Sequence, residues 1–418
     1  MLGEYFDTSL RAQALRDGPG GSLLEGFAQW LRKAGYAEIT ARRHIRGAEH
    51  FNYWTDRKRI PVRSLNEQVL QRFGCHLSRC QCPGYRRHGH WAKPMTLKSV
   101  RLFLEHLRDG GVIHAYVAEP TAKEPVLLTA FCQWMRQQRS TGERTLRNYS
   151  MWIAGFLRCL GENPHKFDAQ SLRAFVLETN RQRGWAAAKH STTALRMFLR
   201  FLIADGSCAA GLDAAVPVVA HWRLSSLPRY LQPEEVERVI ASCNRGAQTD
   251  QRDRAVLLLL ARLGLRAGDV AHLRLGDIDW QGAWIAVSGK SKRQTRLPLT
   301  QEVGDAIAAY LQDGRPRTNA DALFVRARAP TRAFANYCAV SMIVTRAMQR
   351  AGVTCPSRGA AHVLRHSVAT SMLRHGASLQ DIAAILRHRS IETTQIYAKV
   401  HVTALRRIAQ PWPEVRPC

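Results

Sequence analysis

The strongest constraint on the fold is that the first half of the chain carries its apolar residues at helical spacing in two similar stretches. Residues 20–110 and 122–206 contain segments whose large apolar side chains recur every three or four positions, as on the buried face of a helix. A Phe-x-x-Trp motif at Phe27 recurs 104 residues later at Phe131. This spacing predicts a duplicated helical domain, with two unrelated helical segments as the alternative.

The chain is strongly basic. Its 418 residues hold 61 Lys and Arg against 33 Asp and Glu, a formal net charge of +28 at pH 7, and 51 of the 61 are Arg. A charge this far from zero indicates a polyanionic partner, and the planar guanidinium of Arg grips phosphate groups in a bidentate manner. Double-stranded DNA is therefore the expected partner. A basic surface that serves only solubility is the alternative.

The sequence gives no signal for export or membrane insertion. The first residues form no apolar leader, and the most apolar stretch, 255–265, is interrupted by Arg262 and is too short to span a bilayer. The Arg-rich composition is typical of GC-rich bacterial coding, and the ten cysteines are expected to be reduced thiols. We therefore expect a soluble, DNA-associated protein of the bacterial cytoplasm.

Three blocks follow one another along the chain. Residues 1–115 are expected to form a helical N-terminal extension, and residues 120–210 a second helical domain that clasps DNA. A Gly- and Ala-rich linker begins at residue 206, and residues 228–418 form the third block. Its first helix is expected at Pro233, because Pro and the two Glu that follow it are favourable in a first helical turn.

Two turns in the middle of the third block carry basic residues. Gly264 and Gly268 bracket a tight turn that directs the head of Arg266 out of the core, where a fixed guanidinium can meet a phosphate. Two short strands are expected on either side of residues 289–294, so that Lys290 lies at the tip of a hairpin. A hairpin that only touches the DNA backbone is the alternative.

Helices are expected over the last part of the block. His362 and Arg365 are three residues apart and share one face of a long helix that stops at Gly376. The capping pattern that begins at Ser378 starts the next helix, which ends before His388. Ser390 is then expected to cap a last helix that carries Tyr397.

Taken singly, each of these polar residues is typical of a helix cap, a core or a basic surface. Their order and spacing together resemble the tyrosine recombinase family, also called phage-integrase-like site-specific recombinases, over about residues 228–408. The second block resembles the family's helical core-binding domain more loosely, and the first block has no counterpart that the resemblance supplies. All six catalytic positions of the family hold the expected residue types: Arg266, Lys290, His362, Arg365, His388 and Tyr397.

Two residues depart from the family pattern. Arg387 stands before His388 where the family usually has Gly, and Asp269 stands where Glu is common. Neither departure removes a catalytic group. The fold that the resemblance implies is mainly α with a small β-sheet: helical N-terminal DNA-clasping domains and an α+β catalytic domain.

The resemblance implies a mechanism that needs no metal, nucleotide or other cofactor. Tyr397 attacks a DNA phosphodiester and forms a 3′-phosphotyrosine, while Arg266 and Arg365 neutralise the charge that develops on the phosphate oxygens. Lys290 protonates the leaving 5′-oxygen. His362 assists the removal of the tyrosine proton, and His388 binds a phosphate oxygen.

Two further residues are expected to support the catalytic residues. His366 packs against its neighbours and orients them, and Asp269 orients Arg266. Four protomers would then exchange strands through a Holliday junction, with companion recombinases as further partners. The tail after Tyr397 would dock on a neighbouring protomer.

The expected biological role is that of a mobile-element integrase or transposase, because the N-terminal half is extended. A type IB topoisomerase, which uses the same tyrosine chemistry to relax supercoils, is one alternative. A DNA-binding accessory protein without catalysis is the other.

A dense group of sulfur and imidazole side chains lies near the end of the first block. Sulfur and nitrogen ligands of this kind can hold a structural Zn²⁺. Reduced side chains in basic, DNA-contacting loops are the alternative. The candidate ligands are Cys75, Cys80, Cys82, His88 and His90.

Overall fold

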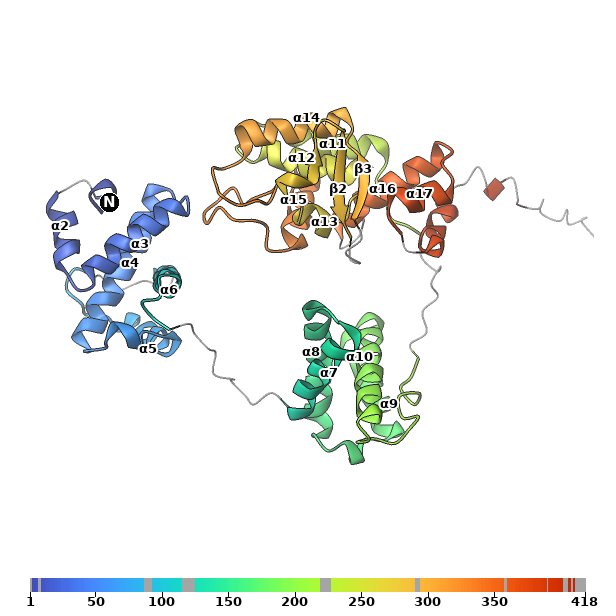
Figure 1. Cartoon of the computed structure of the whole chain (residues 1–418), viewed down its shortest axis with the longest axis horizontal. Coiled ribbons are helices and arrows are strands. Elements are labelled where there is room, and N and C mark those ends of the chain that lie inside the picture. The colour runs from blue at the N-terminus through green and yellow to red at the C-terminus, as the bar shows by residue number, and fades with distance from the viewer. Residues whose placement is uncertain are drawn as a thin grey trace, which may run out of the picture. The chain divides into compact units, whose positions relative to one another are not determined.

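The structure of the chain, a computed structural model, describes residues 2–6, 9–85, 92–114, 125–218, 227–289, 294–356, 359–388, 390–400, 405–406 and 409. The chain divides into two compact units, residues 117–223 and residues 1–116 with 224–418. Separate hydrophobic cores lie within residues 2–113, 128–216 and 231–397 (Figure 1). No helix in the described ranges is both long and apolar enough to cross a membrane.

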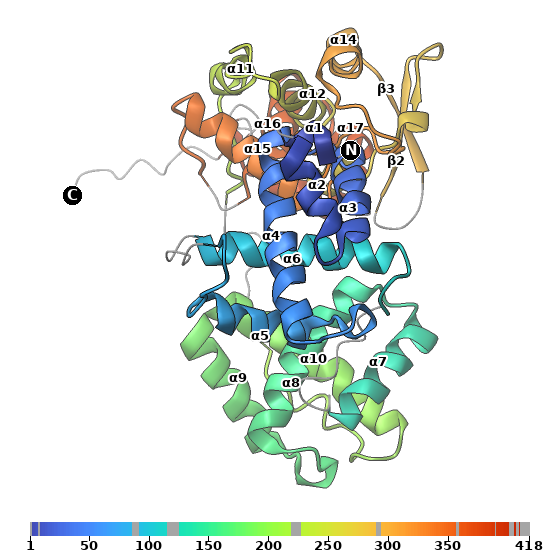
Figure 2. The ribbon, with the colours of Figure 1, turned by 90° about the vertical axis from the view of Figure 1, so that its left-hand side faces the viewer.

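The N-terminal block is helical. Its longest helices, α4 and α6, cross and pack together, and α3 packs against both (Figure 2). Apolar side chains gather on the inward faces, where Phe27, Phe51, Phe73 and Phe103 are fully buried. The elements are α1 (Leu2–Tyr5), α2 (Ser9–Asp17), α3 (Gly21–Lys33), α4 (Glu38–Arg57), the 3₁₀ turn η1 (Val62–Ser64), α5 (Glu67–Leu77) and α6 (Ala92–Asp109).

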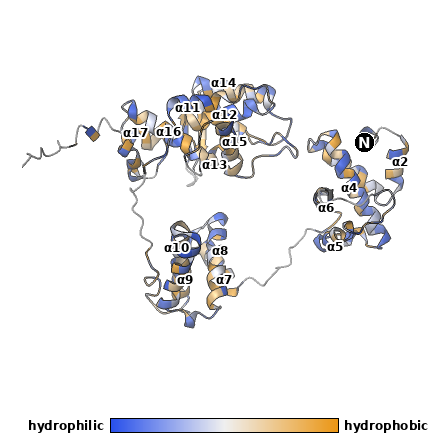
Figure 3. Ribbon diagram, turned by 180° about the vertical axis from the view of Figure 1, so that it is seen from behind, coloured by the Kyte–Doolittle hydropathy of each residue, from blue (hydrophilic) through white to orange (hydrophobic). Residues whose placement is uncertain are grey.

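The second block is a group of four longer helices around its own core. The last of them, α10, packs against the other three. Hydrophobic and hydrophilic residues alternate along these helices, as an amphipathic bundle requires (Figure 3). The elements are α7 (Val126–Arg139), α8 (Glu143–Leu160), the 3₁₀ turn η2 (Pro164–Lys166), α9 (Ala169–Arg183) and α10 (Trp185–Ala204).

An aromatic contact recurs at equivalent places in the two helical blocks. In the first block, Phe27 on α3 meets Phe103 on α6 edge to face, with ring centroids 5.2 Å apart. In the second block, Phe131 on α7 meets Phe198 on α10 edge to face, with ring centroids 5.6 Å apart. Phe27 and Phe131 are the residues that the 104-residue repeat aligns, and both are fully buried.

A second pair of rings repeats in the same order. Phe51 on α4 meets Phe73 on α5 at 5.1 Å, and Phe156 on α8 meets Phe175 on α9 at 5.4 Å, both edge to face. Edge-to-face rings at this distance are a favourable packing arrangement. Within α3–α6 and within α7–α10, the first helix of the four therefore contacts the last, and the second contacts the third, through the same type of ring pair, which is the arrangement expected of a duplication.

The third block combines helices with one small sheet. The antiparallel strands β1 (Ile278–Asp279), β2 (Trp284–Ser288) and β3 (Gln294–Pro298) lie in that order, and β2 pairs with β3 from Trp284 opposite Pro298 to Ser288 opposite Gln294. The helices are α11 (Pro233–Ala241), α12 (Asp250–Ala261), α13 (Ala267–Ala271), α14 (Gln301–Ala309), α15 (Tyr337–Arg350), α16 (Ala360–Arg374) and α17 (Leu379–Ile385). Shorter turns are η3 (Leu275–Asp277), the π-turn η4 (Tyr310–Gly314), η5 (Ile391–Thr393) and η6 (Gln395–Val400).

The predicted fold class, mainly α with a small β-sheet, is confirmed. Three predictions of helix ends are also confirmed. Pro233 is the first residue of α11, Gly376 follows α16 with φ of 91°, and Ser378 caps α17 through its side chain. The predicted last helix is wrong. Ser390 caps only the short 3₁₀ turn η5, and Tyr397 lies in a second one, η6.

We predict that Phe156→Ala destabilises the second helical block by about 3–5 kcal/mol, because it removes a fully buried ring and leaves a cavity. The block should then exchange its backbone amides faster in hydrogen–deuterium exchange of the full chain.

Met151 offers a control on the same helix, because half of its surface is exposed. Met151→Ala should change stability by less than about 0.5 kcal/mol. Equal exchange in the two variants would contradict the assignment of Phe156 to the core.

Candidate active site

The turn between α12 and α13 sets the position of Arg266. Residue 264 has φ of 58°, and a Cβ there would come within 2.7 Å of the Leu386 side chain, so this position requires Gly. The guanidinium of Arg266 is half-buried, and its Nη2 donates a hydrogen bond to the carbonyl oxygen of Arg387 at 3.1 Å. Arg266 is thereby anchored to the segment that follows α17.

Arg365 is the most buried cation of the site. It projects from α16 with only 4% of its surface exposed, and its guanidinium donates to the backbone carbonyls of Gly264 and Leu386. Burial is the main reason that its pKa is lowered to about 10, and the charge of Arg266 lowers it further. At this pKa Arg365 keeps its positive charge at neutral pH.

Tyr397 and His366 meet inside the block. Tyr397 is 1% exposed, and its Oη lies 2.8 Å from Nδ1 of His366 on α16, which is hydrogen-bonding distance. Burial raises the pKa of Tyr397 to about 12, and the charge of Arg365 acts in the opposite direction. The phenol is therefore protonated at neutral pH and needs a proton acceptor before it can act as a nucleophile.

His388 lies in the connection that follows α17. Its Nδ1 is 2.8 Å from Oγ1 of Thr394, in the turn that leads into η6. This contact fixes the ring, and Nε2 remains as the second nitrogen that can meet a ligand. The residue before it, Arg387, has φ of 53°, a conformation that non-Gly residues adopt uncommonly.

The imidazoles of the site are neutral. Burial lowers the pKa of His366 to about 4, and His362 and Arg365 lower it further. Burial also lowers the pKa of His388 to about 4, followed by the charges of Arg365 and Arg266. Burial lowers the pKa of His362, and the charges of Arg365 and Arg266 lower it further. Two guanidinium groups therefore supply a positive field while the imidazoles can accept protons, a combination that suits a phosphate and an attacking hydroxyl.

Arg387 and Asp269 form a buried ion pair. Nη2 of Arg387 lies 2.5 Å from Oδ2 of Asp269, and the two side chains are 8% and 9% exposed. Asp269 also accepts the backbone N–H of Arg266 at 3.3 Å, whereas Nη1 of Arg266 is 4.0 Å away. The carboxylate therefore holds Arg387 more closely than the guanidinium of Arg266.

The structure brings five of the six residues named from the sequence into one region: Arg266, His362, Arg365, His388 and Tyr397. Lys290 lies outside the described residues. Sequence reasoning missed the contact of His366 with the tyrosine hydroxyl. The signal was present, because His362 and His366 are four residues apart on one helix and so share a face.

The cysteine and histidine residues of the first block are arranged differently from the prediction. Cys80 and Cys82 do meet imidazoles, but these belong to His50 and His76. Cys75 is exposed and stands outside this group, since it precedes His76 on α5 and points about 100° away from it. The predicted ligands His88 and His90 lie outside the described residues.

Several known proteins are similar to this chain. Residues 229–403 match the phage integrase family. A protein of Sinorhizobium fredii (strain NBRC 101917 / NGR234) described as an integrase/recombinase, y4rA, is 37% identical over 95% of this chain and 95% of its own length. The tyrosine recombinase XerC of Lactobacillus delbrueckii subsp. bulgaricus is 27% identical over 66% of this chain and 94% of its own.

A solved structure shares the fold. A lambda integrase tetramer bound to a Holliday junction aligns with a TM-score of 0.52 at 16% identity, and the match covers 80% of this chain and 91% of that one. The alignment with the Sinorhizobium protein spans nearly the whole of both chains at more than a third identity. The chain therefore belongs to the tyrosine recombinase, or phage integrase, family of site-specific recombinases, enzymes that cut and rejoin DNA.

Proposed function

We propose that this recombinase serves a mobile element as an integrase or transposase, and that it acts on double-stranded DNA through a covalent bond to Tyr397. The observation that carries the proposal is the contact of the Tyr397 hydroxyl with His366, in the positive field of Arg365 and Arg266. The XerC relative leaves about a third of this chain unmatched, whereas y4rA matches nearly all of it. This extra length favours the mobile-element assignment.

The proposed reaction begins with Tyr397 Oη. The oxygen attacks a DNA phosphorus in line, the bond from phosphorus to the 5′-oxygen breaks, and a 3′-phosphotyrosine forms. The phenolic proton passes to Nδ1 of His366, which lies within hydrogen-bond reach and is neutral at neutral pH. Lys290, whose position the structure does not describe, supplies the proton that the leaving 5′-oxygen takes up.

The charged residues around the tyrosine stabilise the transition state. Arg266 and Arg365 neutralise the charge on the non-bridging oxygens, where fixed donors are worth far more than in water. His388, held at Nδ1 by Thr394, donates to a phosphate oxygen from Nε2. Attack of a 5′-hydroxyl from a second duplex on the phosphotyrosine reverses the same steps and reseals the strand, so the chemistry requires no metal or nucleotide.

Access to the tyrosine requires a conformational change. The side chain of Tyr397 is 1% exposed, and the turn that carries it, η6, is a short 3₁₀ element. The backbone of such a turn has poorer hydrogen-bond geometry than an α-helix and can rearrange, although the Tyr397 ring also packs in a cluster with Ala369 and Leu386. We infer that binding of DNA uncovers the tyrosine through a rearrangement that keeps its hydroxyl within reach of His366, and that four protomers then assemble and exchange strands through a Holliday junction.

The two helical blocks are proposed to be duplicated DNA-binding domains. They share four helices in the same order and the same two edge-to-face aromatic contacts. Each block carries more Arg and Lys than Asp and Glu. The N-terminal copy would extend the length of DNA that one protomer recognises.

Covalent capture tests the nucleophile. Wild type and Tyr397→Phe are incubated with nicked duplexes that tile the ends of the flanking genomic element, and the products are run on denaturing gels. We expect a covalent protein–DNA band with wild type, and none with Tyr397→Phe, because only a phenol can form the phosphotyrosine.

Tyr230→Phe serves as the matched control and should keep the band, since the hydroxyl of Tyr230 contacts Arg374, on the surface of the block. Intact DNA binding without a band on any duplex would support the accessory-protein alternative. Relaxation of plasmids of any sequence would support the topoisomerase alternative.

We predict that His366→Gln slows cleavage by about 10²–10⁴-fold, the usual contribution of a general base. In wild type, neutral His366 should keep the rate nearly constant from about pH 6 to pH 9. In the variant, solvent must take the proton, so the rate should rise with pH toward the pKa of Tyr397, about 12.

The measurement is the single-turnover rate of covalent complex formation as a function of pH. His375→Gln is the control, because His375 is exposed at the end of the same helix. A His366→Gln profile as flat as that of wild type would exclude His366 as the proton acceptor.

We predict that Arg387 and Asp269 contribute to stability as a coupled pair. Asp269→Ala strands a buried guanidinium and should cost about 3–5 kcal/mol of stability. Arg387→Gly removes the charge that Asp269→Ala would strand, so the double variant should recover on the order of 2 kcal/mol relative to additivity. Urea unfolding of the four proteins measures this coupling, and strict additivity would show that the pair contributes nothing.

A further inference from the structure

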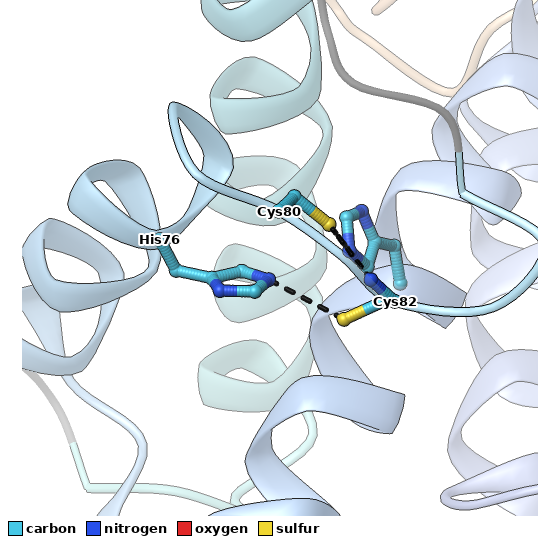
Figure 4. A group of neighbouring side chains, drawn as sticks. His76, Cys80 and Cys82 are labelled. Carbon is cyan, nitrogen blue, oxygen red and sulfur yellow. Dashed lines mark hydrogen bonds between the residues drawn. The ribbon is translucent and has the colours of Figure 1, made fainter.

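Four side chains of the N-terminal block converge far along the sequence from the catalytic residues. His50 comes from α4, His76 from the last turn of α5, and Cys80 and Cys82 from the loop that follows α5. One ligand atom from each, the imidazole nitrogens and the two Sγ atoms, lies within 4.8 Å of each of the other three. Figure 4 shows His76, Cys80 and Cys82 directed into one small volume.

Two of the distances between the four ligand atoms match the edges of a tetrahedral metal site. Sγ of Cys80 is 3.4 Å from Nε2 of His50, and Sγ of Cys82 is 3.4 Å from Nε2 of His76. In a tetrahedron with ordinary Zn–N and Zn–S bonds, the N···S edge measures roughly 3.5 Å. Two thiol–imidazole hydrogen bonds alone would explain these two distances, but they would not require both pairs to face each other within 4.8 Å.

The surroundings hold the ligands in place. His50 and Cys80 are 1% and 2% exposed, and the ring of Tyr85 stacks on that of His50 with centroids 4.0 Å apart. Trp54 stacks against the ring of His76. The backbone N–H of Cys82 donates to Sγ of Cys80 at 3.4 Å, an interaction that stabilises a thiolate.

We propose that His50, His76, Cys80 and Cys82 form a structural Zn²⁺ site that fastens the loop after α5 to helices α4 and α5. Two thiolates and two imidazoles are a ligand set that zinc prefers among the common biological metals. The four protein ligands close the coordination shell, so the ion has no open position for a substrate. Its part is to stabilise the N-terminal block, and the tyrosine chemistry proceeds without it.

Metal analysis of the full-length protein tests the proposal. Wild type purified under reducing conditions should hold about one zinc per chain by mass spectrometry of the dissolved ions. Cobalt introduced in its place should give the visible absorption of a tetrahedral ion with thiolate ligands. A wild-type protein that binds neither ion after incubation with it would overturn the proposal, whatever the variants do.

Variants then identify the ligands. Cys80→Ser/Cys82→Ser should lose the zinc, whereas Cys75→Ser should keep it, because Cys75 is exposed on the same segment and lies outside the group. His50→Ala and His76→Ala should each weaken binding. Retention of zinc in these histidine variants together with its loss in His88→Ala/His90→Ala would overturn this ligand set in favour of ligands further along the loop.

A structural role of the zinc ion also predicts a change in local stability when the ion is removed. A zinc chelator should lower the thermal midpoint of wild type and raise hydrogen exchange within residues 38–109, but it should leave the exchange of residues 250–374 unchanged. Chelation that leaves the N-terminal block unaltered, although zinc is removed, would overturn the structural role. Because the readouts are metal content and local stability, failure of the proposed recombination activity would not affect this test.

Discussion

The geometry of the active site depends on one buried cation. Arg365 donates to the carbonyls of Gly264 and Leu386, so a single guanidinium joins α16 to the turn before α13 and to the end of α17. These are hydrogen bonds from a charged donor, which are worth roughly 1.5–3 kcal/mol each. Removal of the guanidinium would leave two carbonyls unpaired and would release the segments that carry Arg266 and His388. The residue proposed to bind the phosphate therefore also builds the site that receives it.

Burial and the same cation together set the protonation of the neighbouring imidazoles. Burial is the main reason that the pKa of His366 and that of His388 lie near 4, and the positive charge of Arg365 lowers both further. The site thus contains cations that do not titrate near neutral pH and imidazoles that remain neutral there. A phosphate needs the first and a phenol that must lose a proton needs the second, and one arrangement supplies both.

Sequence was sufficient where a property is local. The Pro at the start of α11, the cap at Ser378 and the hairpin strands around residues 289–294 follow from backbone preferences that a few residues decide. It failed for the segment of Tyr397. Ser390 and Thr394 direct their side chains to Glu392 and His388, which competes with a continuous helix and leaves two 3₁₀ turns.

Long-range contacts were beyond sequence reasoning. The pairing of Arg387 with Asp269 joins positions 118 residues apart, and nothing local indicates it. The same holds for the imidazole of His50, which meets Cys80, whereas His76 lies only six residues before Cys82. The predicted ligands were neighbours in sequence, whereas His50 reaches the group from another helix, 30 residues before Cys80.

The two helical blocks explain why only one of them would need a metal. In the second block, α9 and α10 are joined by Gly184 alone, so their connection has little freedom to lose on folding. In the first block, residues 78–91 separate α5 from α6, and ordering a longer connection costs more conformational entropy. A cross-link between this connection and the helices offsets that cost, and a four-ligand metal provides one without an oxidised disulfide. Cys80 and Cys82 lie in the connection by which the first block differs from the second, and His50 and His76 lie on the two helices to which the metal would fasten it.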